Sequence, residues 1–297
     1  MPWSTHPRVM TVRRRSRIVD VAVETIDCFR RHQTGRNAAV LAYWGFLSVF
    51  PLLLAATTIL GFVLEGNEKL RDDIVDSAVS QIPVVGTTVQ ANAGDLQGNT
   101  WALVIGVLTA LWASMKAFIG VQAAFDDIWE VDIDERANIA VKRLRALIGL
   151  IAIGLAQVAT VVLSGIAGAS ELAAISKVLI LVGALVVNIA VVASVFRFLT
   201  AAPVTWAMVW PGAVFAGVLF TVLQLVGTVV VSRMIADAGE IYGTFASMLA
   251  LLSWFSLHAL ISLYGAELNA ALERRREQRR NLTGWLASDL DRSDLIQ

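Results

Sequence analysis

The residues with the clearest chemical potential in this sequence are ionisable groups inside long apolar segments. Lys116 stands about 15 residues into an apolar stretch that begins near Trp101, so about 22 Å from its start. An ionised side chain in hydrocarbon costs several kcal/mol and needs a compensating interaction. Lys116 either faces an internal cavity and binds an anionic group such as a lipid phosphate, or it snorkels toward the head groups or pairs with Glu267.

The last apolar segment carries polar residues on two sides of its predicted helix. One stripe holds Trp254, His258, Ser262, Gly265 and Asn269, and roughly the opposite side holds Ser253, Ser256, Tyr264 and Glu267. Such a helix fits between other helices or beside a wet cavity better than it fits against lipid. Our candidate substrate-binding residues here are Trp254, His258, Ser262, Glu267 and Asn269. Taken alone, His258 is more typical of an interhelical hydrogen bond than of a proton relay.

The first apolar segment adds Trp44 and Ser48, which share a helix face with Pro51. Pro51 has no N–H, so it frees the carbonyl of Leu47 and predicts a kink. Trp44 and Ser48 are therefore further candidate substrate contacts, and Pro51 is the candidate hinge.

Spacings typical of catalytic or metal sites do not occur in this sequence. It contains no GxxxxGK[ST] loop and no HExxH, and its three histidines are far apart. The acidic run from Asp126 to Glu135 is interpreted as a solvated loop, because nothing in the sequence fixes those side chains in one shell. The single cysteine, Cys28, excludes an intramolecular disulfide. We expect no catalytic residues, no metal and no cofactor, and hence no enzyme.

Six apolar segments position these residues, and each is long enough to cross a bilayer as a helix. They are Ala38–Leu64, Trp101–Phe125, Leu144–Ser170, Ile175–Thr200, Pro211–Ile235 and Thr244–Ala271. The chain is 57% hydrophobic and only 16% charged, which excludes a soluble domain with all six segments in one core. The sequence predicts an all-α polytopic membrane protein with six transmembrane helices.

The charge distribution predicts the orientation of these helices. The net charge is +0, which gives no global reason to expect nucleic acid as a partner. Of the 24 basic residues, 19 fall on one side of the predicted topology and 4 on the other. Because Lys and Arg accumulate on the cytoplasmic side, both termini are expected in the cytoplasm.

Three parts are expected along the chain: an N-terminal segment over 1–37, a transmembrane domain over 38–271 and a basic tail over 272–297. Ser16–Arg31 predicts an amphipathic helix that lies in the membrane interface; the alternative is a simple cytoplasmic cap on the bundle. Leu70–Ile82 predicts a second amphipathic helix, on the outer side.

Three passages resemble the YihY/BrkB family of bacterial inner-membrane proteins. They are AAVLAYWGFLSVFP from Ala38, LWASMKAFIGVQAAFDDIWEV from Leu111 and LLSWFSLHALISLYGAELNA from Leu251. The resemblance covers about residues 20–280. It implies six spans in the bacterial inner membrane and an association with movement of envelope lipids. Members of the family were once labelled as a ribonuclease, a label that the residues here do not support.

The leading hypothesis is a transporter or flippase without its own ATPase, acting on an anionic amphiphile, with membrane lipids as its partners. It depends on Lys116, the polar last span, Pro51 and the outer amphipathic helix. One alternative is a structural or scaffolding membrane protein of the cell envelope, which needs no cavity. Another is a membrane ribonuclease, which needs clustered acids and histidines on the cytoplasmic face.

Overall fold

The computed structural model describes residues 9–11, 13, 16–63, 100–151, 153, 174–223 and 244–294, and the regular structure in these ranges is entirely helical. The helices are α2 (Arg17–Arg31), α3 (Thr34–Val63), α6 (Thr100–Ile128), the short η2 (Ile133–Glu135), α8 (Ala174–Phe198) and α10 (Thr244–Asp294). Two further helices cover 139–151 and Trp206–Leu223. The predicted all-α class is confirmed.

Three helices in the described ranges are long and apolar enough to cross a membrane: Val104–Ile128, Trp206–Leu223 and Met248–Asn281. Leu185–Phe198 is a shorter apolar helix. Helices also occupy the predicted first and fourth spans, as α3 and α8. Most of the third predicted span and the outer amphipathic helix lie outside the described residues. The chain is thus a polytopic membrane protein, and the count of six spans stays a prediction.

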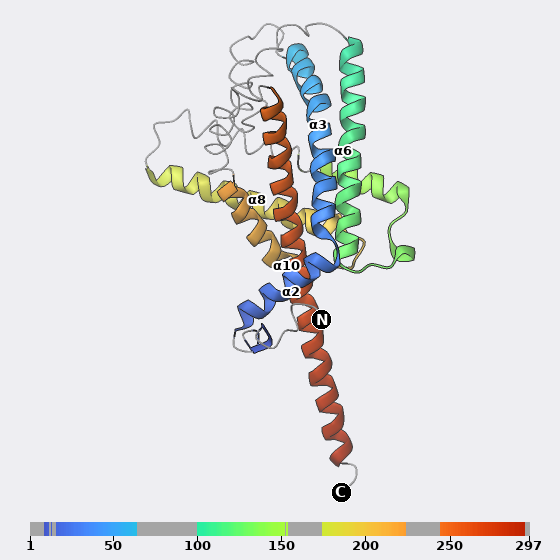
Figure 1. The fold of residues 1–297 in the computed structure, drawn as a ribbon, viewed down its shortest axis with the longest axis vertical. Helices are drawn as coiled ribbons and strands as arrows, with labels where there is room; N and C mark the ends of the chain where they lie inside the picture. Colours follow the sequence, from blue (N-terminus) through green and yellow to red (C-terminus); the bar gives the residue numbers. More distant parts are fainter. Residues whose placement is uncertain are drawn as a thin grey trace.

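α3, α6 and α10 stand side by side, and α8 lies across them (Figure 1). The start of α3, the end of α6 and the end of α8 meet at one end of this bundle, where α2 also packs on α10. We call this the basic end, because the arginines near both ends of the chain gather there. The connections at 31–37, 126–145 and 199–205 lie at this end, and the sequence analysis assigned all of them to the same side of the membrane.

α2 begins where the sequence predicts and packs directly on α10. The Ser16 side chain caps its first turn by accepting a hydrogen bond from the N–H of Val19 at 3.5 Å. At its other end the ring of Phe29 stacks on Tyr264 of α10, with ring centroids 4.1 Å apart. These contacts fit a cap on the bundle, and the position of α2 in the membrane interface stays a prediction.

α10 crosses the Trp206–Leu223 helix at two glycines. A Cβ at Gly212 would overlap the carbonyl oxygen of Gly265, and a Cβ at Gly265 would lie 2.8 Å from that of Gly212. One turn along α10, Asn269 accepts from the Gly212 N–H at 2.6 Å and donates to the Val209 carbonyl at 3.0 Å. Because neither glycine has a Cβ, the two backbones can approach closely, and the hydrogen bonds of Asn269 fix the distance between the helices.

The buried core lies near the basic end. Phe125 of α6 and Phe196 of α8 are almost fully buried and pack edge to face at 5.4 Å. Leu263, Val209 and Ala213 complete the same apolar cluster. This packing fixes the ends of α6 and α8 against the middle of α10, close to the polar residues described next.

Candidate functional site

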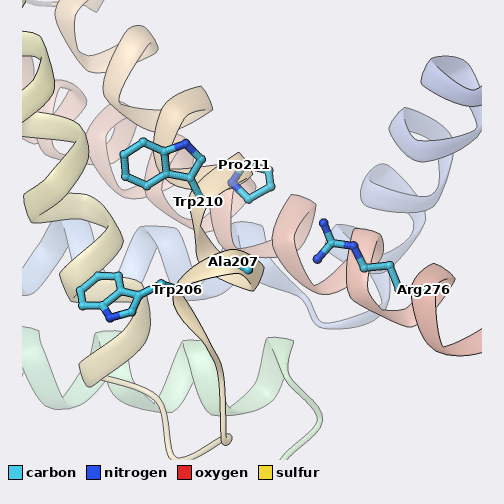
Figure 2. A pocket seen from close by; sticks show the side chains of 5 residues that line it. All are labelled: Trp206, Ala207, Trp210, Pro211 and Arg276. Atoms are coloured by element: carbon cyan, nitrogen blue, oxygen red, sulfur yellow. The ribbon is translucent and has the colours of Figure 1, made fainter.

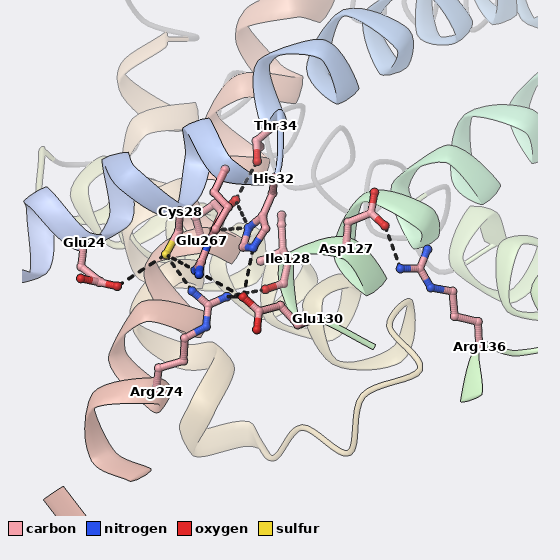
Figure 3. Close-up of polar contacts among 11 residues, drawn as sticks. Glu24, Cys28, His32, Thr34, Asp127, Ile128, Glu130, Arg136, Glu267 and Arg274 are labelled. Carbon is pink, nitrogen blue, oxygen red and sulfur yellow. Dashed lines mark hydrogen bonds and ion pairs between the residues drawn. The ribbon is translucent and has the colours of Figure 1, made fainter. Parts of the chain in front are cut away.

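A cluster of polar side chains joins α2, α3, α6 and α10 at the basic end (Figure 3). At its centre Glu267 of α10 has an exposed fraction of 0%. Its carboxylate accepts hydrogen bonds from the Thr34 hydroxyl at 2.7 Å and from His32 Nδ1 at 2.9 Å. We call this cluster, made of Cys28, His32, Thr34, Glu130, Glu267 and Arg274, the polar junction.

His32 bridges two carboxylates. Its Nδ1 faces Glu267, and its Nε2 lies 3.3 Å from Oε1 of Glu130. Which ring nitrogen donates depends on the tautomer of the imidazole. His32 thus links Glu267 of α10 to the turn that follows α6.

Two chain reversals bring these residues together. Gln33 (φ 52°) and Glu130 (φ 53°) are the non-glycine residues with positive φ in the described ranges. Gln33 separates α2 from α3, and Glu130 follows the end of α6. Left-handed backbone is uncommon for such residues and is kept where the surrounding contacts fix it. Here it directs His32 and Glu130 toward each other.

Arg274 connects the remaining parts of the junction. Its guanidinium donates to the Cys28 sulfur at 2.7 Å and to the carbonyl of Ile128 at 2.8 Å, and it lies 3.3 Å from Glu130. Burial alone would raise the pKa of Glu130, but Arg274, the hydrogen bond from His32 and the charge of Arg31 hold that pKa below its usual value.

Burial also acts on Cys28. It raises the pKa of the thiol, and this outweighs the opposing effect of the guanidiniums of Arg274 and Arg31. Cys28 is therefore a buried, protonated thiol that accepts hydrogen bonds, and its role in the junction is structural.

The acidic run 126–135 is solvated only in its second half, where Asp132, Asp134 and Glu135 are exposed. Asp126, in the last turn of α6, is 1% exposed, and its carboxylate accepts from the Ala201 N–H at 2.7 Å and the Thr200 hydroxyl at 3.2 Å. Asp127 pairs with Arg136 at 2.8 Å. The expectation of a solvated loop was wrong for Asp126, because its donors lie about 75 residues away, which local composition does not reveal. Within the described ranges, no three His, Cys, Asp or Glu residues are grouped so as to hold a metal ion.

Lys116, unlike the buried Glu267, lies on the exposed surface of its helix. Its side chain is exposed, and its ammonium lies 5.9 Å from the centroid of the Trp112 ring. Trp112 in turn meets Trp44 of α3 edge to face at 5.8 Å. The suggested pairing of Lys116 with Glu267 is wrong, because the buried carboxylate of Glu267 is held by His32 and Thr34.

The other candidate residues mostly bind protein groups. Ser48 donates to the carbonyl of Gly45 at 2.7 Å. His258 is hydrogen-bonded to the Trp254 carbonyl of its own helix at 2.9 Å and stacks on Phe220, so only its ring contact is interhelical. Ser262 is half-buried on α10.

Pro51 lies within α3, which continues as one helix to Val63. The kink and the hinge at Pro51 stay predictions, as does substrate binding by each of the candidate residues.

Sequence reasoning missed six residues of these two sites: Cys28, His32, Thr34, Glu130, Arg274 and Trp112. A buried glutamate in a span requires donors, and a His-x-Thr sequence directly before the first span supplies two of them. Trp112 stands four residues before Lys116, at a spacing that places both on one helix face. The contacts of Cys28, Glu130 and Arg274 depend on how distant segments pack, and no local signal indicates them.

Taken together, apolar helices joined by polar contacts at one end define a helical multi-pass membrane protein. Within this class the chain belongs to the family described as Virulence factor BrkB, whose model matches residues 25–288. The resemblance found in the three sequence passages is thereby confirmed.

Several curated proteins are similar to this chain. "Inner membrane protein YhjD" of Escherichia coli (strain K12) is 25% identical over 165 residues, covering 53% of this chain and 49% of that protein, so the match spans about half of YhjD. "Putative ribonuclease-like protein YfkH" of Bacillus subtilis (strain 168) is 22% identical, covering 86% of this chain and 95% of the relative. A "UPF0761 membrane protein" of Alkalilimnicola ehrlichii is 26% identical, covering 86% of this chain and 58% of the relative. Among solved structures, none matches this chain.

Proposed function

We propose that this protein binds and moves an anionic amphiphile, with a membrane phospholipid as its substrate class, and that Lys116 holds the anionic group. The observation that carries the proposal is the exposed ammonium of Lys116 beside Trp112. Lys116 stands 12 residues before the end of α6, which places its backbone about 18 Å from the basic end.

The energetics favour an anionic partner at this position. A lysine near the centre of a bilayer costs about 2.5–3.5 kcal/mol on insertion scales. A cation–π contact with one ring returns about 0.5–2 kcal/mol, which leaves the ammonium under-compensated. Trp112, one helical turn before Lys116, offers the ammonium an indole ring and no hydrogen-bond acceptor. A phosphate brought by an amphiphile from the surrounding lipid would complete the compensation.

Reconstituted vesicles provide the test. The full chain is placed in vesicles with fluorescent phosphatidylglycerol, and loss of fluorescence on adding an impermeant reductant reports movement between leaflets. We expect Lys116→Ala to slow this movement about tenfold, which corresponds to 1.4 kcal/mol. Lys116→Arg should keep part of the rate, because the charge survives while its geometry changes.

Lys142→Ala is the matched control, because Lys142 is the same residue type at the basic end and its backbone carbonyl, which accepts from Gln122, is kept. Its rate should equal that of the unsubstituted protein. Equal rates for Lys116→Ala and the unsubstituted chain would refute the role of Lys116. Equal rates for phosphatidylcholine and phosphatidylglycerol would refute the anionic selectivity. No movement with any variant would favour the scaffolding alternative.

We further propose that the basic end faces the cytoplasm, since the 19-to-4 asymmetry of basic residues favours it. The test is labelling of Asp95→Cys and Asp291→Cys in a Cys28→Ser background with an impermeant thiol reagent in intact cells. Position 95 should react and position 291 should not. The reverse pattern would overturn the orientation, and the bacterial inner membrane remains the proposed location.

A further inference from the structure

An open groove lies at the basic end between α10 and the start of the Trp206–Leu223 helix (Figure 2). It has a volume of about 440 Å³ and is lined by Trp206, Ala207, Trp210, Pro211 and Arg276. This size is within the usual range of small-ligand sites, about 300–1,000 Å³. The groove is separate from the polar junction and from Lys116, which do not line it.

The lining places apolar rings and a cation around one space. Both indoles project from the helix start, and Arg276 reaches toward Ala207 and Pro211 from α10 (Figure 2). Trp206 and Trp210 are 46% and 51% exposed, so both rings are available to surrounding lipid. Tryptophan at a membrane–water boundary places its ring against the acyl region and its N–H toward the head groups.

The charge around the groove is positive. Arg276 lies 3.0 Å from Glu273, and Arg280 lies 2.8 Å from the other oxygen of the same carboxylate, so one acid faces two guanidiniums. A third, that of Arg197, lies 4.6 Å from the centroid of the Trp206 ring. Arg276 and Arg197 against the one carboxylate of Glu273 leave a local excess that is complementary to an anionic group.

We propose that this groove binds the head group of an anionic phospholipid of the leaflet at the basic end. Arg276 contacts the phosphate, while Trp206 and Trp210 pack beside the glycerol and the first acyl carbons. The open form of the groove fits this occupant, because a lipid keeps its acyl chains in the bilayer and brings only its head group to the protein. The inference does not depend on transport, and a bound lipid here can be retained whether or not Lys116 acts on a substrate.

Native mass spectrometry of the full chain, titrated with phosphatidylglycerol or phosphatidylcholine, tests the proposal. We expect phosphatidylglycerol to bind more tightly. Removing one arginine charge near a membrane surface is worth about 1 kcal/mol, so Arg276→Gln should weaken binding about fivefold. Trp210→Ala should weaken it by a similar factor without changing the charge, and it keeps the test valid if Arg276→Gln disturbs Glu273.

Two controls separate this groove from other sites. Arg143→Gln removes an exposed arginine on the 139–151 helix and should leave the affinity unchanged. Arg276→Gln should cause the same fivefold loss in a Lys116→Ala background as in the unsubstituted chain, so failure of the proposed transport function is distinguishable from failure here. Equal affinity for the two lipids, or equal losses in Arg143→Gln and Arg276→Gln, would overturn the proposal. Full competition by inorganic phosphate would replace the lipid with a free anion as the ligand.

Discussion

The polar junction and the surface around Lys116 hold ionisable side chains in opposite ways. Glu267 is fully buried, and its carboxylate is held by His32 and Thr34. Lys116 is exposed, and its ammonium faces an indole ring. A buried charge with matched donors is what helix packing requires, whereas an exposed charge at mid-span has no packing role. Whether an ionisable group has hydrogen-bonding partners within the protein, more than its position in a span, therefore distinguishes a structural role from a functional one.

The largest expected effect tests the structural half of this comparison. Glu267→Ala leaves His32 and Thr34 without their acceptor in a buried site. Removing one partner of a buried charged pair lowers the free energy of unfolding by about 3–5 kcal/mol. We expect a large fall in melting temperature, measured by thermal unfolding in detergent, and a lower yield of monodisperse protein.

A double substitution controls for simple loss of volume. If Glu267 and His32 act as a pair, Glu267→Ala with His32→Ala should cost clearly less than the sum of the single changes. Additive losses would show that the pairing contributes nothing, and the contrast with Lys116 would then lose its energetic basis.

The second prediction concerns the crossing at Gly212 and Gly265, where α10 packs closely on another helix without a charged group. Gly212→Ala places a methyl group on the Gly265 carbonyl, so the helices must separate and weaken the Asn269 hydrogen bonds. Overpacking of this kind costs about 1–3 kcal/mol, again read as a fall in melting temperature. Gly183→Ala on α8 is the matched control, because its Cβ would meet nothing within 4 Å. A similar loss in both variants would assign the effect to helix backbone and not to the crossing.

The third prediction concerns acid. The pKa of Glu130 is lowered in the folded protein, so its interactions stabilise the fold above the usual glutamate value of about 4.3 and are lost as the pH falls below it. The side chain is 52% exposed, so solvent screens the effect. We expect Glu130→Gln to lower the melting temperature at pH 7 by no more than about 2 °C. As the pH is lowered below the usual glutamate value, the difference between the variant and the unsubstituted protein should shrink; a constant difference would contradict the assignment.

The smallest effect is expected at Lys116 itself. Lys116→Ala should change the free energy of unfolding by no more than about 0.5 kcal/mol, the range of exposed substitutions. Thermal unfolding next to Glu267→Ala under the same conditions measures it. A loss comparable to that of Glu267→Ala would show that Lys116 is part of the packing, and the division between the two regions would fail.

The helices were predictable because the length of each apolar segment can be read directly from the local sequence. Ser16–Arg31 predicts α2 to within a residue of its observed bounds, through its polar start and its helical spacing. The last span was predicted to end near Ala271, yet α10 continues to Asp294. Hydropathy reports where a helix leaves the membrane and not where its hydrogen-bonded backbone ends.

The contacts of the polar residues could not be derived in the same way. Glu267 was predicted as a polar residue within a span and Asp126 as part of a solvated loop, and the donors of both come from segments more than 70 residues away. Which donor reaches which acceptor depends on how α3, α6 and α10 meet, and on the reversals at Gln33 and Glu130. Local pattern supplies candidates, and the packing of distant segments selects among them.

The length of α10 has a mechanical consequence. A helix of 51 residues extends about 76 Å, more than twice the thickness of a hydrocarbon core of about 30 Å. Its far portion leaves the bundle as a single rod (Figure 1). A tilt imposed at the distal end is carried along the helix to Arg274, Asn269 and Glu267, where α10 is held against four other helices. A partner that binds the distal part of α10 thus also acts on the contacts that Arg274, Asn269 and Glu267 make within the bundle.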